Sequence, residues 1–320
     1  MPAVSVVVPT YNHAPFLERR LRSILDQTWQ DFDVLVLDDA STDATPAVLE
    51  RFEAHPRVRI ERQPENSGSP FRQWNAGLVR TDSAFVWIAE SDDEADPRFL
   101  ETLVSRMQLY PRCGLAFAQS LSIDAEGHAS GTLRRWTDHV DPAHWLWDYV
   151  NGGRDECARY LAVANTIPSA SAVVFQRQAF VDAGGAPEHL RLAGDWLTWF
   201  RLLLGTDVAF VAEPLNRHRS HAGTVRAGLA DDARWWDETL SVWQVVRESL
   251  PLPVATRRRI VDIVREVVVR LMAHPVANRR TIADLWRFGR ELDPALPLST
   301  ARMVMTRAMA GARAGARPSR

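Results

Sequence analysis

The sequence predicts an α/β fold in which helices flank a mostly parallel sheet, with a helical extension at the C-terminal end. Short apolar runs rich in β-branched residues alternate with helical stripes over roughly the first 110 residues. The connections between them are short, as they are where helices cross over between parallel strands. From about residue 231 onward the apolar spacing is helical throughout. These three observations together predict the fold class.

Four strands and four helices are expected in the first part of the sheet. The strands are apolar runs bounded by turn residues, at 4–8, 34–37, 58–61 and 85–88. Helices are expected to begin near Pro15, Pro46, Phe71 and Pro97. Strands and helices in this alternating order predict right-handed crossovers and a parallel arrangement.

The pattern changes after residue 110. The elements expected there are a strand and turn at 115–127, a strand at 169–175, a helix at 178–183, a helix from 196 and a strand at 208–211. Residues 131–165 are rich in Trp and His, and their apolar residues follow neither the helical nor the strand period. Further helices are expected in a Trp-rich stretch after 231, at 253–272 and at 279–291.

The composition is that of an ordinary globular protein, with 46% hydrophobic and 24% charged residues. A formal net charge of −2 gives no reason to expect a nucleic-acid partner. The two cysteines, Cys113 and Cys157, lack the spacing of a metal site and are expected as buried free thiols. No apolar run approaches the ~20 residues that span a bilayer. We therefore expect a cytoplasmic protein, with peripheral contact at the inner membrane face left open.

Three carboxylates crowd the end of the strand at 85–88, namely Glu90, Asp92 and Asp93. Like charges this close raise one another's pKa unless a cation or donor groups neutralise them. Oxygen ligands in a tight cluster suit a hard divalent ion, Mn²⁺ or Mg²⁺, that also holds phosphates. The alternative is an acidic loop with helix-capping residues, since Asp96-Pro97 opens the next helix.

Polar clusters also follow Val8 and Leu37, where two other strands end. In parallel sheets of this kind, ligands bind outside the carboxyl ends of the strands. Three polar loops on one rim therefore predict a single site. No G-x-G-x-x-G follows the first strand, which argues against an oxidoreductase that binds a dinucleotide.

With these loops identified, the chain resembles the family 2 glycosyltransferases, inverting enzymes with the GT-A (Rossmann-like) fold. The resemblance rests on six segments in order: Ser5–Asn12, Val36–Asp43, Asn66–Gly68, Asn75–Gly77, Glu90–Asp93 and Gly194–Trp196. It implies a GT-A catalytic domain at 1–226, with a nucleotide-binding half at 1–110 and an acceptor half at 111–226. Residues 227–320 would form a helical C-terminal extension outside the resemblance.

The resemblance implies inverting, metal-dependent transfer of a sugar from a nucleotide-sugar donor, with a UDP- or dTDP-sugar expected. The acceptor would be a glycan or a lipid-linked saccharide in surface polysaccharide biosynthesis, and the cofactor Mn²⁺ or Mg²⁺. The alternative is a non-catalytic GT-A-like module that binds nucleotide. The presence of both Asp92 and Asp195 favours the enzyme. The oligomeric state stays open.

By resemblance, one set of residues would line the donor: Pro9, Thr10, Tyr11, Asp38, Asp39, Asn66, Gly68, Arg72, Glu90, Ser91, Asp92 and Arg226. Tyr11 would stack on the base and Asp39 would accept its N–H. The alternative for Asp38 and Asp39 is a turn and helix-capping role. Arg72 would pair with phosphate or remain a solvated surface residue.

Asp92 is the expected direct metal ligand, with Asp93 and Glu90 assisting or binding ribose. His221 is expected to contact metal or phosphate. The alternative for His221 is a plain surface-loop histidine. The family usually has Asp where this chain has Glu90, so the role of this longer side chain stays open between the metal and sugar hydroxyls.

Asp195 is the expected general base, because an inverting transfer needs a carboxylate to take the acceptor hydroxyl proton. The alternative is that Asp195 caps the helix beginning at Trp196. Trp199 is expected in the core, and Trp196 is open between the core and the floor of the acceptor site.

The last twenty residues contain five arginines and no acidic residue. This composition suits docking on an anionic membrane, and the alternative is a frayed, solvated terminus.

Overall fold

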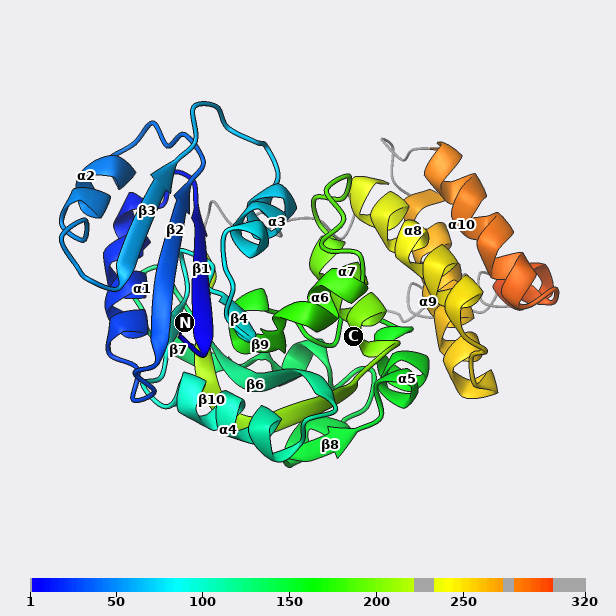
Figure 1. Cartoon of the computed structure of the whole chain (residues 1–320). Helices are drawn as coiled ribbons and strands as arrows, with labels where there is room; N and C mark the ends of the chain where they lie inside the picture. The colour runs from blue at the N-terminus through cyan, green and yellow to red at the C-terminus, as the bar shows by residue number, and fades with distance from the viewer. Residues whose placement is uncertain (1, 222–232, 273–278, 302–320) are drawn as a thin grey trace, which may run out of the picture. The chain divides into compact units, whose positions relative to one another are not determined.

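The computed structural model describes residues 2–221, 233–272 and 279–301 (Figure 1). The chain divides into two compact units, Met1–Ala227 and Gly228–Arg320, each described by itself below. The boundary expected after residue 226 lies one residue before this division. Every strand in the described ranges belongs to the first unit.

The strands of the first unit are β1 Val4–Thr10, β2 Phe32–Asp38, β3 Val58–Arg62, β4 Phe85–Ile88, β5 Glu94–Ala95, β6 Cys113–Ile123, β7 Ala129–Thr132, β8 Tyr149–Asn151, β9 Val173–Gln176 and β10 Asp207–Arg219. Its helices are α1 Ala14–Leu25, α2 Thr45–Glu50, α3 Pro70–Val79, α4 Phe99–Leu109, α5 Gly153–Glu156, α6 Arg177–Asp182 and α7 Gly194–Leu203. The predicted α/β fold with a sheet flanked by helices is confirmed.

The sheet has the order β3-β2-β1-β4-β9-β6-β10-β5, with β7 paired to β6 and β8 to β10. The four strands β3, β2, β1 and β4 are parallel, as predicted. In the second part, β9 runs antiparallel between β4 and β6, whereas β6 and β10 are parallel. The register sets Thr10 opposite Asp38 and Val7 opposite Ile88. The carboxyl ends of β1, β2 and β4 therefore share one edge.

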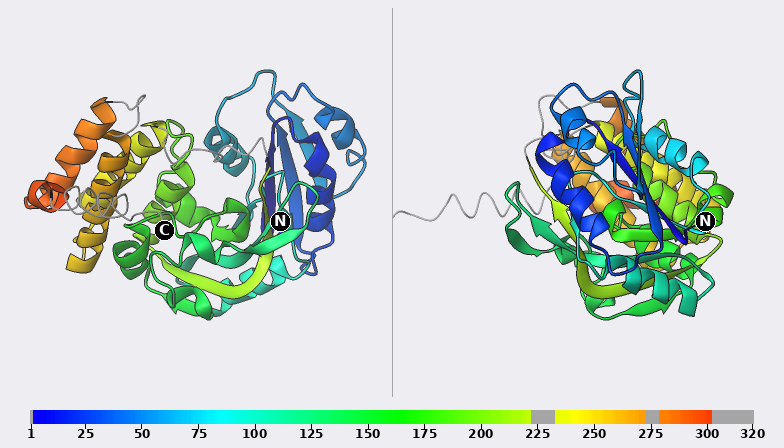
Figure 2. Two further views of the ribbon diagram at one scale, coloured as in Figure 1. Left: turned by 180° about the vertical axis from the view of Figure 1, so that it is seen from behind. Right: turned by 60° about the vertical axis from the view of Figure 1, so that its left-hand side comes forward.

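Alternate residues of β1 face opposite sides of the sheet. Val4, Val6 and Val8 belong to the core cluster that also contains residues of α1 and α4. Val7 faces the other way, against Gly77 of α3. Figures 1 and 2 show α1 and α3 on opposite sides of β1, β2 and β3. Burial on both faces explains why these strands are uninterrupted apolar runs.

Two elements differ from their predicted form. The strand expected from residue 169 is a 3-10 turn at Ala170–Ala172 followed by the short β9. The strand expected at 208–211 is the long β10, because irregular pairing around Pro214 lets it continue along β6. Residues 131–165 contain only short strands and helical turns. Cys113 and Cys157 are buried free thiols, as predicted.

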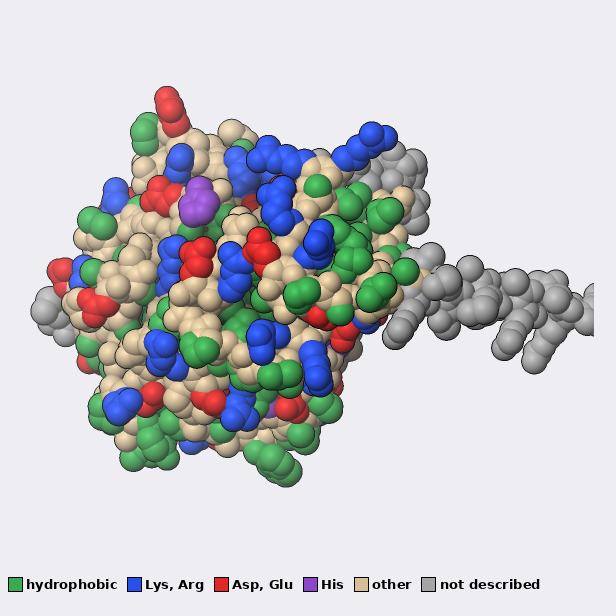
Figure 3. Space-filling view, turned by 90° about the vertical axis from the view of Figure 1, so that its right-hand side faces the viewer, with side chains coloured by type: hydrophobic (Ala, Val, Ile, Leu, Met, Phe, Trp, Pro, Cys, Tyr) green, Lys and Arg blue, Asp and Glu red, His purple; other side chains and the backbone are tan. Residues whose placement is uncertain are grey.

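The second unit contains α8 Ala233–Ser249, α9 Val254–Met272 and α10 Arg279–Leu292, which confirms the predicted helices. Trp243 stacks on Phe288 at 5.8 Å between ring centroids. Figure 3 shows arginine side chains scattered among acidic and hydrophobic ones on one face. Among the residues described, no helix has the length and apolarity to cross a bilayer. The arginines of 302–320 lie outside the described residues.

Candidate active site

The loops after β1 and β2 are tied together by Asn12. Its backbone has φ 55°, a left-handed conformation that asparagine tolerates better than most residues. The Asn12 Oδ1 accepts hydrogen bonds from the backbone N–H of Thr42 at 2.8 Å and of Asp43 at 3.3 Å. The Asn12 N–H donates to Ser41 Oγ at 2.9 Å. The chain therefore turns sharply at Asn12 before α1 begins.

Asp38 and Asp39 are both buried but have different partners. Asp38 Oδ1 accepts the Ser41 N–H at 3.0 Å, which is the turn role left open for it. Asp39 Oδ1 accepts the Ser67 N–H at 2.9 Å and Gln73 Nε2 at 2.6 Å. Asp39 Oδ2 accepts the Ser67 hydroxyl at 2.8 Å. Asp39 thus joins the end of β2 to the loop before α3.

The predicted donor residues of the 66–72 segment lie beside Asp39. Asn66 Nδ2 donates to the Asp39 carbonyl at 3.2 Å, and Asn66 Oδ1 accepts the Gly68 N–H at 2.6 Å. Gly68 has φ 67°, which favours glycine there. Arg72 is exposed; it donates to the Ser67 carbonyl at 3.1 Å and lies 3.6 Å from the Glu188 carboxylate.

Pro9, Thr10 and Tyr11 end β1 at the same edge. The Thr10 carbonyl accepts the Asp39 N–H at 2.9 Å, so the two strand ends are in contact. The Thr10 hydroxyl is buried and has no hydrogen-bond partner within the described part of the chain. The Tyr11 side chain is 44% exposed, which leaves its ring accessible for stacking. Arg226, also expected at the donor, lies outside the described residues.

Glu90 follows β4 and is crowded by other carboxylates. Its N–H donates to Ser171 Oγ at 3.0 Å. Burial raises the pKa of Glu90 to about 8, and the negative charges of Asp93, Asp92 and Asp195 add to the effect. The side chain keeps some solvent access, so water moderates this shift. With a pKa near 8, much of the Glu90 carboxyl is protonated at pH 7.

The structure does not bring Asp93 to the expected metal position. This side chain is 1% exposed, and its Oδ1 accepts the Arg219 N–H at 2.8 Å. The same oxygen lies 3.5 Å from His218 Nδ1, and Oδ2 accepts the Ser169 hydroxyl at 3.4 Å. Asp93 therefore holds β10 to the end of β4, because its carboxylate is taken by these groups.

Two buried arginines lie against the acidic segment, and neither role was predicted. Arg20 of α1 is fully buried, with its guanidinium carbon 4.7 Å from the Trp87 ring centroid. Burial lowers the pKa of Arg20 to about 10, against the opposing charges of Asp93, Asp92, Glu90 and Glu94. Arg219 forms an ion pair with Glu94. These cations offset the crowding of carboxylates after β4.

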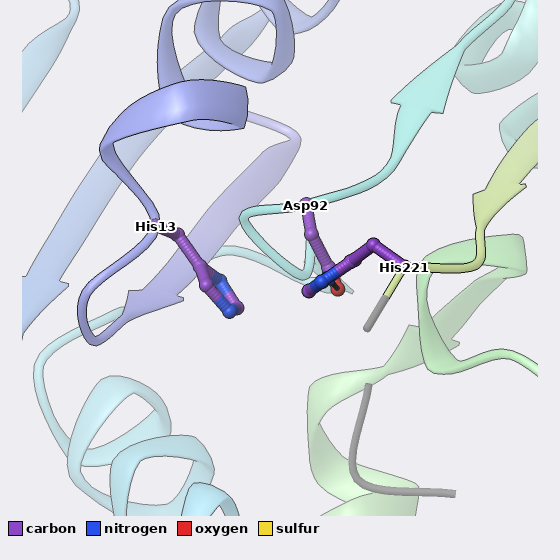
Figure 4. A group of neighbouring side chains, drawn as sticks. All are labelled: His13, Asp92 and His221. Carbon is purple, nitrogen blue, oxygen red and sulfur yellow. Dashed lines mark hydrogen bonds and ion pairs between the residues drawn. The ribbon is translucent and has the colours of Figure 1, made fainter. Parts of the chain in front are cut away.

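Asp92 meets two histidines instead of a second carboxylate. Potential ligand atoms of His13, Asp92 and His221 all lie within 4.8 Å of one another (Figure 4). Asp92 Oδ2 is 3.2 Å from His221 Nε2. Burial favours a higher pKa for Asp92, but the hydrogen bond with His221 and the charges of His13 and His218 outweigh it and lower the pKa. An ionised carboxylate with two imidazoles is a donor set that fits a divalent cation.

A second histidine and carboxylate group lies in the turn after β6 and consists of Asp124, Glu126 and His128. Asp124 Oδ1 accepts three backbone N–H groups, those of residues 126, 127 and 128. All three side chains are exposed. These contacts explain the group as a hydrogen-bonded turn.

Asp195 is the second residue of α7 and is buried. Its Oδ1 accepts the N–H of Trp196 at 2.8 Å, and its Oδ2 accepts Asn165 Nδ2 at 3.0 Å. Its charge contributes to the raised pKa of Glu90, after burial and the charges of Asp93 and Asp92. Trp199 is fully buried, as predicted, and Trp196 is also in the core, with Nε1 donating to the Leu161 carbonyl at 2.7 Å.

Comparison with known proteins agrees with this geometry. The model of "Glycosyl transferase family 2" matches residues 5–180. The "Putative teichuronic acid biosynthesis glycosyltransferase TuaG" of Bacillus subtilis (strain 168) is 34% identical over 248 residues, 77% of this chain and 88% of TuaG.

Two solved structures show the same fold. S. aureus TarS 1-349 in complex with UDP-GlcNAc has a TM-score of 0.61 at 14% identity and covers 95% of this chain and 91% of its own. The mannosyltransferase PcManGT from Pyrobaculum calidifontis, in complex with GDP-Man and Mn²⁺, has a TM-score of 0.54 at 20% identity and covers 100% and 76%. With the family model matching more than half of the residues, the chain belongs to glycosyl transferase family 2 and is a glycosyltransferase with a GT-A type fold.

Proposed function

We propose that this glycosyltransferase moves a sugar from a nucleotide-sugar donor, with inversion, to a hydroxyl of a glycan or lipid-linked saccharide. The observation that carries the proposal is the group that Asp92 forms with His13 and His221 beside the carboxyl ends of β1 and β4, in a chain of glycosyl transferase family 2. The similarity to TuaG supports a place in surface polysaccharide biosynthesis. A lipid-linked acceptor would bring the enzyme to the inner membrane face, in the cytoplasm.

The donor nucleotide would lie along the edge formed by the ends of β1 and β2. Tyr11 offers an accessible ring for stacking on the base. Asp39 Oδ2 accepts one hydrogen bond, from Ser67, and a carboxylate oxygen can accept a second. Uracil and thymine each present an imide N–H, so we propose a UDP- or dTDP-sugar. Asn66, Gly68 and Arg72 would border the donor beyond the base.

Asp92 and His221 would hold the divalent cation, Mn²⁺ or Mg²⁺. When bound, such a cation stabilises the negative charge that develops on the departing nucleoside diphosphate. Ser91 is buried, its hydroxyl lies 2.7 Å from His13 Nδ1, and it stays among the residues proposed to line the donor. The Mn²⁺ in the PcManGT complex supports a cation in this fold.

Asp195 would act as the general base. It takes the acceptor hydroxyl proton while that oxygen bonds to the anomeric carbon. The bond from that carbon to the donor phosphate breaks, and the nucleoside diphosphate leaves with the electron pair. Asn165 Nδ2 donates a hydrogen bond to one carboxylate oxygen of Asp195 at 3.0 Å, which orients the proposed base.

The test is thermal stability of the full chain with UDP, dTDP, GDP and CDP, with and without MnCl₂, repeated on Asp92→Ala. A ligand that binds only the folded state raises its stability by mass action. We expect the largest Mn²⁺-dependent rise with UDP or dTDP and its loss in Asp92→Ala. The sugar donors of that nucleotide are then assayed for hydrolysis and transfer. Binding without turnover of any donor would instead favour a non-catalytic nucleotide-binding module.

A further inference from the structure

His13 is a residue that the donor and base assignments leave without a role. It precedes α1, whereas Asp92 follows β4 and His221 follows β10. Figure 4 shows the His13 ring directed across the site toward the other two side chains. The centroids of the two imidazole rings are 6.0 Å apart. Three separate elements thus bring three metal-ligating side chains to one place.

The His13 ring is held by one nitrogen only. Its Nδ1 lies 2.7 Å from the hydroxyl of Ser91, which is 2% exposed. The other ring nitrogen, Nε2, makes no hydrogen bond to any residue that the structure describes. Histidines that bind metals characteristically hold their second nitrogen in a hydrogen bond, which fixes the tautomer and the ring. With Nδ1 held by Ser91, Nε2 remains for a ligand.

The local backbone places this ring. The left-handed turn at Asn12 redirects the chain, and the His13 N–H donates to Thr45 Oγ1 at 3.1 Å. One turn into α1, Phe16 packs against the His221 ring at 4.7 Å between centroids. The start of α1 therefore positions both imidazole rings.

The spacing agrees with ligands around one cation. Adjacent ligands of an octahedral ion, each about 2.1 Å from it, lie about 3 Å apart. Asp92 Oδ2 and His221 Nε2 are 3.2 Å apart. The whole group spans at most 4.8 Å, and opposite ligands of such an ion lie about 4.2 Å apart. Small side-chain adjustments would bring all three to bonding distance.

We propose that His13 is a third protein ligand of the cation, so that two imidazoles and one carboxylate hold it and the site prefers Mn²⁺ to Mg²⁺. This rests on the cation placed above at Asp92 and His221. Mg²⁺ favours oxygen ligands, whereas imidazole nitrogen suits transition metals and Mn²⁺ takes both. The preference for Mn²⁺ follows because the His13 imidazole supplies a nitrogen ligand at a position that an oxygen would otherwise occupy.

The test is Mn²⁺ binding to the full chain with and without UDP, measured from the electron paramagnetic resonance signal of free MnCl₂. Wild type is compared with His13→Ala, His13→Gln and His128→Ala. We expect both His13 variants to bind Mn²⁺ about 10- to 100-fold more weakly, the size of effect seen for changes around metal ligands. His128→Ala removes a histidine from the exposed turn and should bind as wild type does. In both His13 variants, the affinity for Mg²⁺, measured by competition, should come closer to the affinity for Mn²⁺.

A second measurement separates ligation from a structural role. Electron spin echo modulation of bound Mn²⁺ detects directly coordinated nitrogen, and we expect two imidazoles in wild type and one in His13→Gln. Unchanged affinity, an unchanged nitrogen count, or no Mn²⁺ binding to wild type with UDP present would each overturn the proposal. Glycosyl transfer is judged separately, by donor turnover, so either idea can fail alone.

Discussion

Asp195 lies in the first turn of α7, where its carboxylate accepts hydrogen bonds from Trp196 and Asn165, so it does not cap a helix that begins at Trp196. The proposed reaction needs a base at this position. Asparagine has nearly the same shape as aspartate and keeps one acceptor oxygen, but it cannot take a proton. We therefore expect Asp195→Asn to keep the stability of the protein and to lower kcat by about 10²- to 10⁴-fold. Donor turnover and thermal unfolding, measured side by side, check this.

The control for that variant is nucleotide binding. Asp195 is not among the residues proposed to line the donor, so the stabilisation by UDP and Mn²⁺ should stay at the wild-type value. If Asp195→Asn unfolds at a much lower temperature with turnover reduced only in proportion, Asp195 acts structurally, through its hydrogen bonds to Trp196 and Asn165, and the base lies elsewhere.

Glu90 carries a pH dependence that can be measured on metal-free protein. Its pKa is raised from 4.5 to about 8, first by burial and then by Asp93 and Asp92. Between these values the folded state holds a proton that the unfolded state releases, so stability falls as pH rises from about 5 to 8. The slope reaches at most about 1.4 kcal/mol per pH unit, and the partial exposure of Glu90 reduces it.

We expect Glu90→Gln to lack this component, so its stability relative to wild type should increase between pH 5 and 8. Urea unfolding in excess EDTA at several pH values measures the difference. Parallel stability curves for the two proteins would show that the Glu90 carboxyl titrates near its ordinary value.

At the scale of elements, α3 is fixed by two residues that the sequence marked only as part of a motif. Asn75 Nδ2 donates to the Ala186 carbonyl at 3.0 Å, and its Oδ1 accepts the Ala186 N–H at 2.9 Å. Gly77 packs against β1 so closely that a Cβ there would lie 2.5 Å from Val7 Cγ1. These contacts hold the helix that carries Gln73 and therefore the orientation of Asp39.

We expect Gly77→Ala to lower the free energy of unfolding by about 1–3 kcal/mol, because the added methyl group forces α3 away from β1. Nucleotide binding should weaken as well, since Gln73 moves with the helix. Gly205→Ala is the matched control: a Cβ at Gly205 would meet nothing closer than 4.0 Å. Urea unfolding that ranks the two variants equally would contradict this account.

At the scale of the whole molecule, every described residue of the candidate site lies in the unit Met1–Ala227. A ligand stabilises the cooperative unit that binds it. We expect calorimetry to resolve two unfolding transitions. UDP with Mn²⁺ should raise the midpoint temperature of only one of them. Val264→Ala, in the buried face of α9, should lower the midpoint temperature of the other transition and so assign that transition to the second unit. A single transition that both changes move would mean that the units unfold together.

Much of the fold was predictable, because the strands buried on both faces are nearly unbroken apolar runs and the helices between them have one apolar stripe. The position of β9 was not, since a run such as Val173–Gln176 carries no information on which strands will flank it or in which direction. The length of β10 was not predictable either. Its last residues, Asn216–Arg219, are polar and follow an irregularity at Pro214, and only their pairing with β6 makes them part of the strand.

The sequence by itself determined that carboxylates follow β4 and that Asp92 and Asp195 belong to one family pattern, because both facts depend on residue type and order. Only the tertiary structure decided which neighbours each side chain has. Asp92 and Asp93 are adjacent in the chain, yet one meets His221 and the other the Arg219 backbone. His13 lies 79 positions before Asp92 and reaches it only because the parallel register of β1 and β4 ends both strands at the same edge.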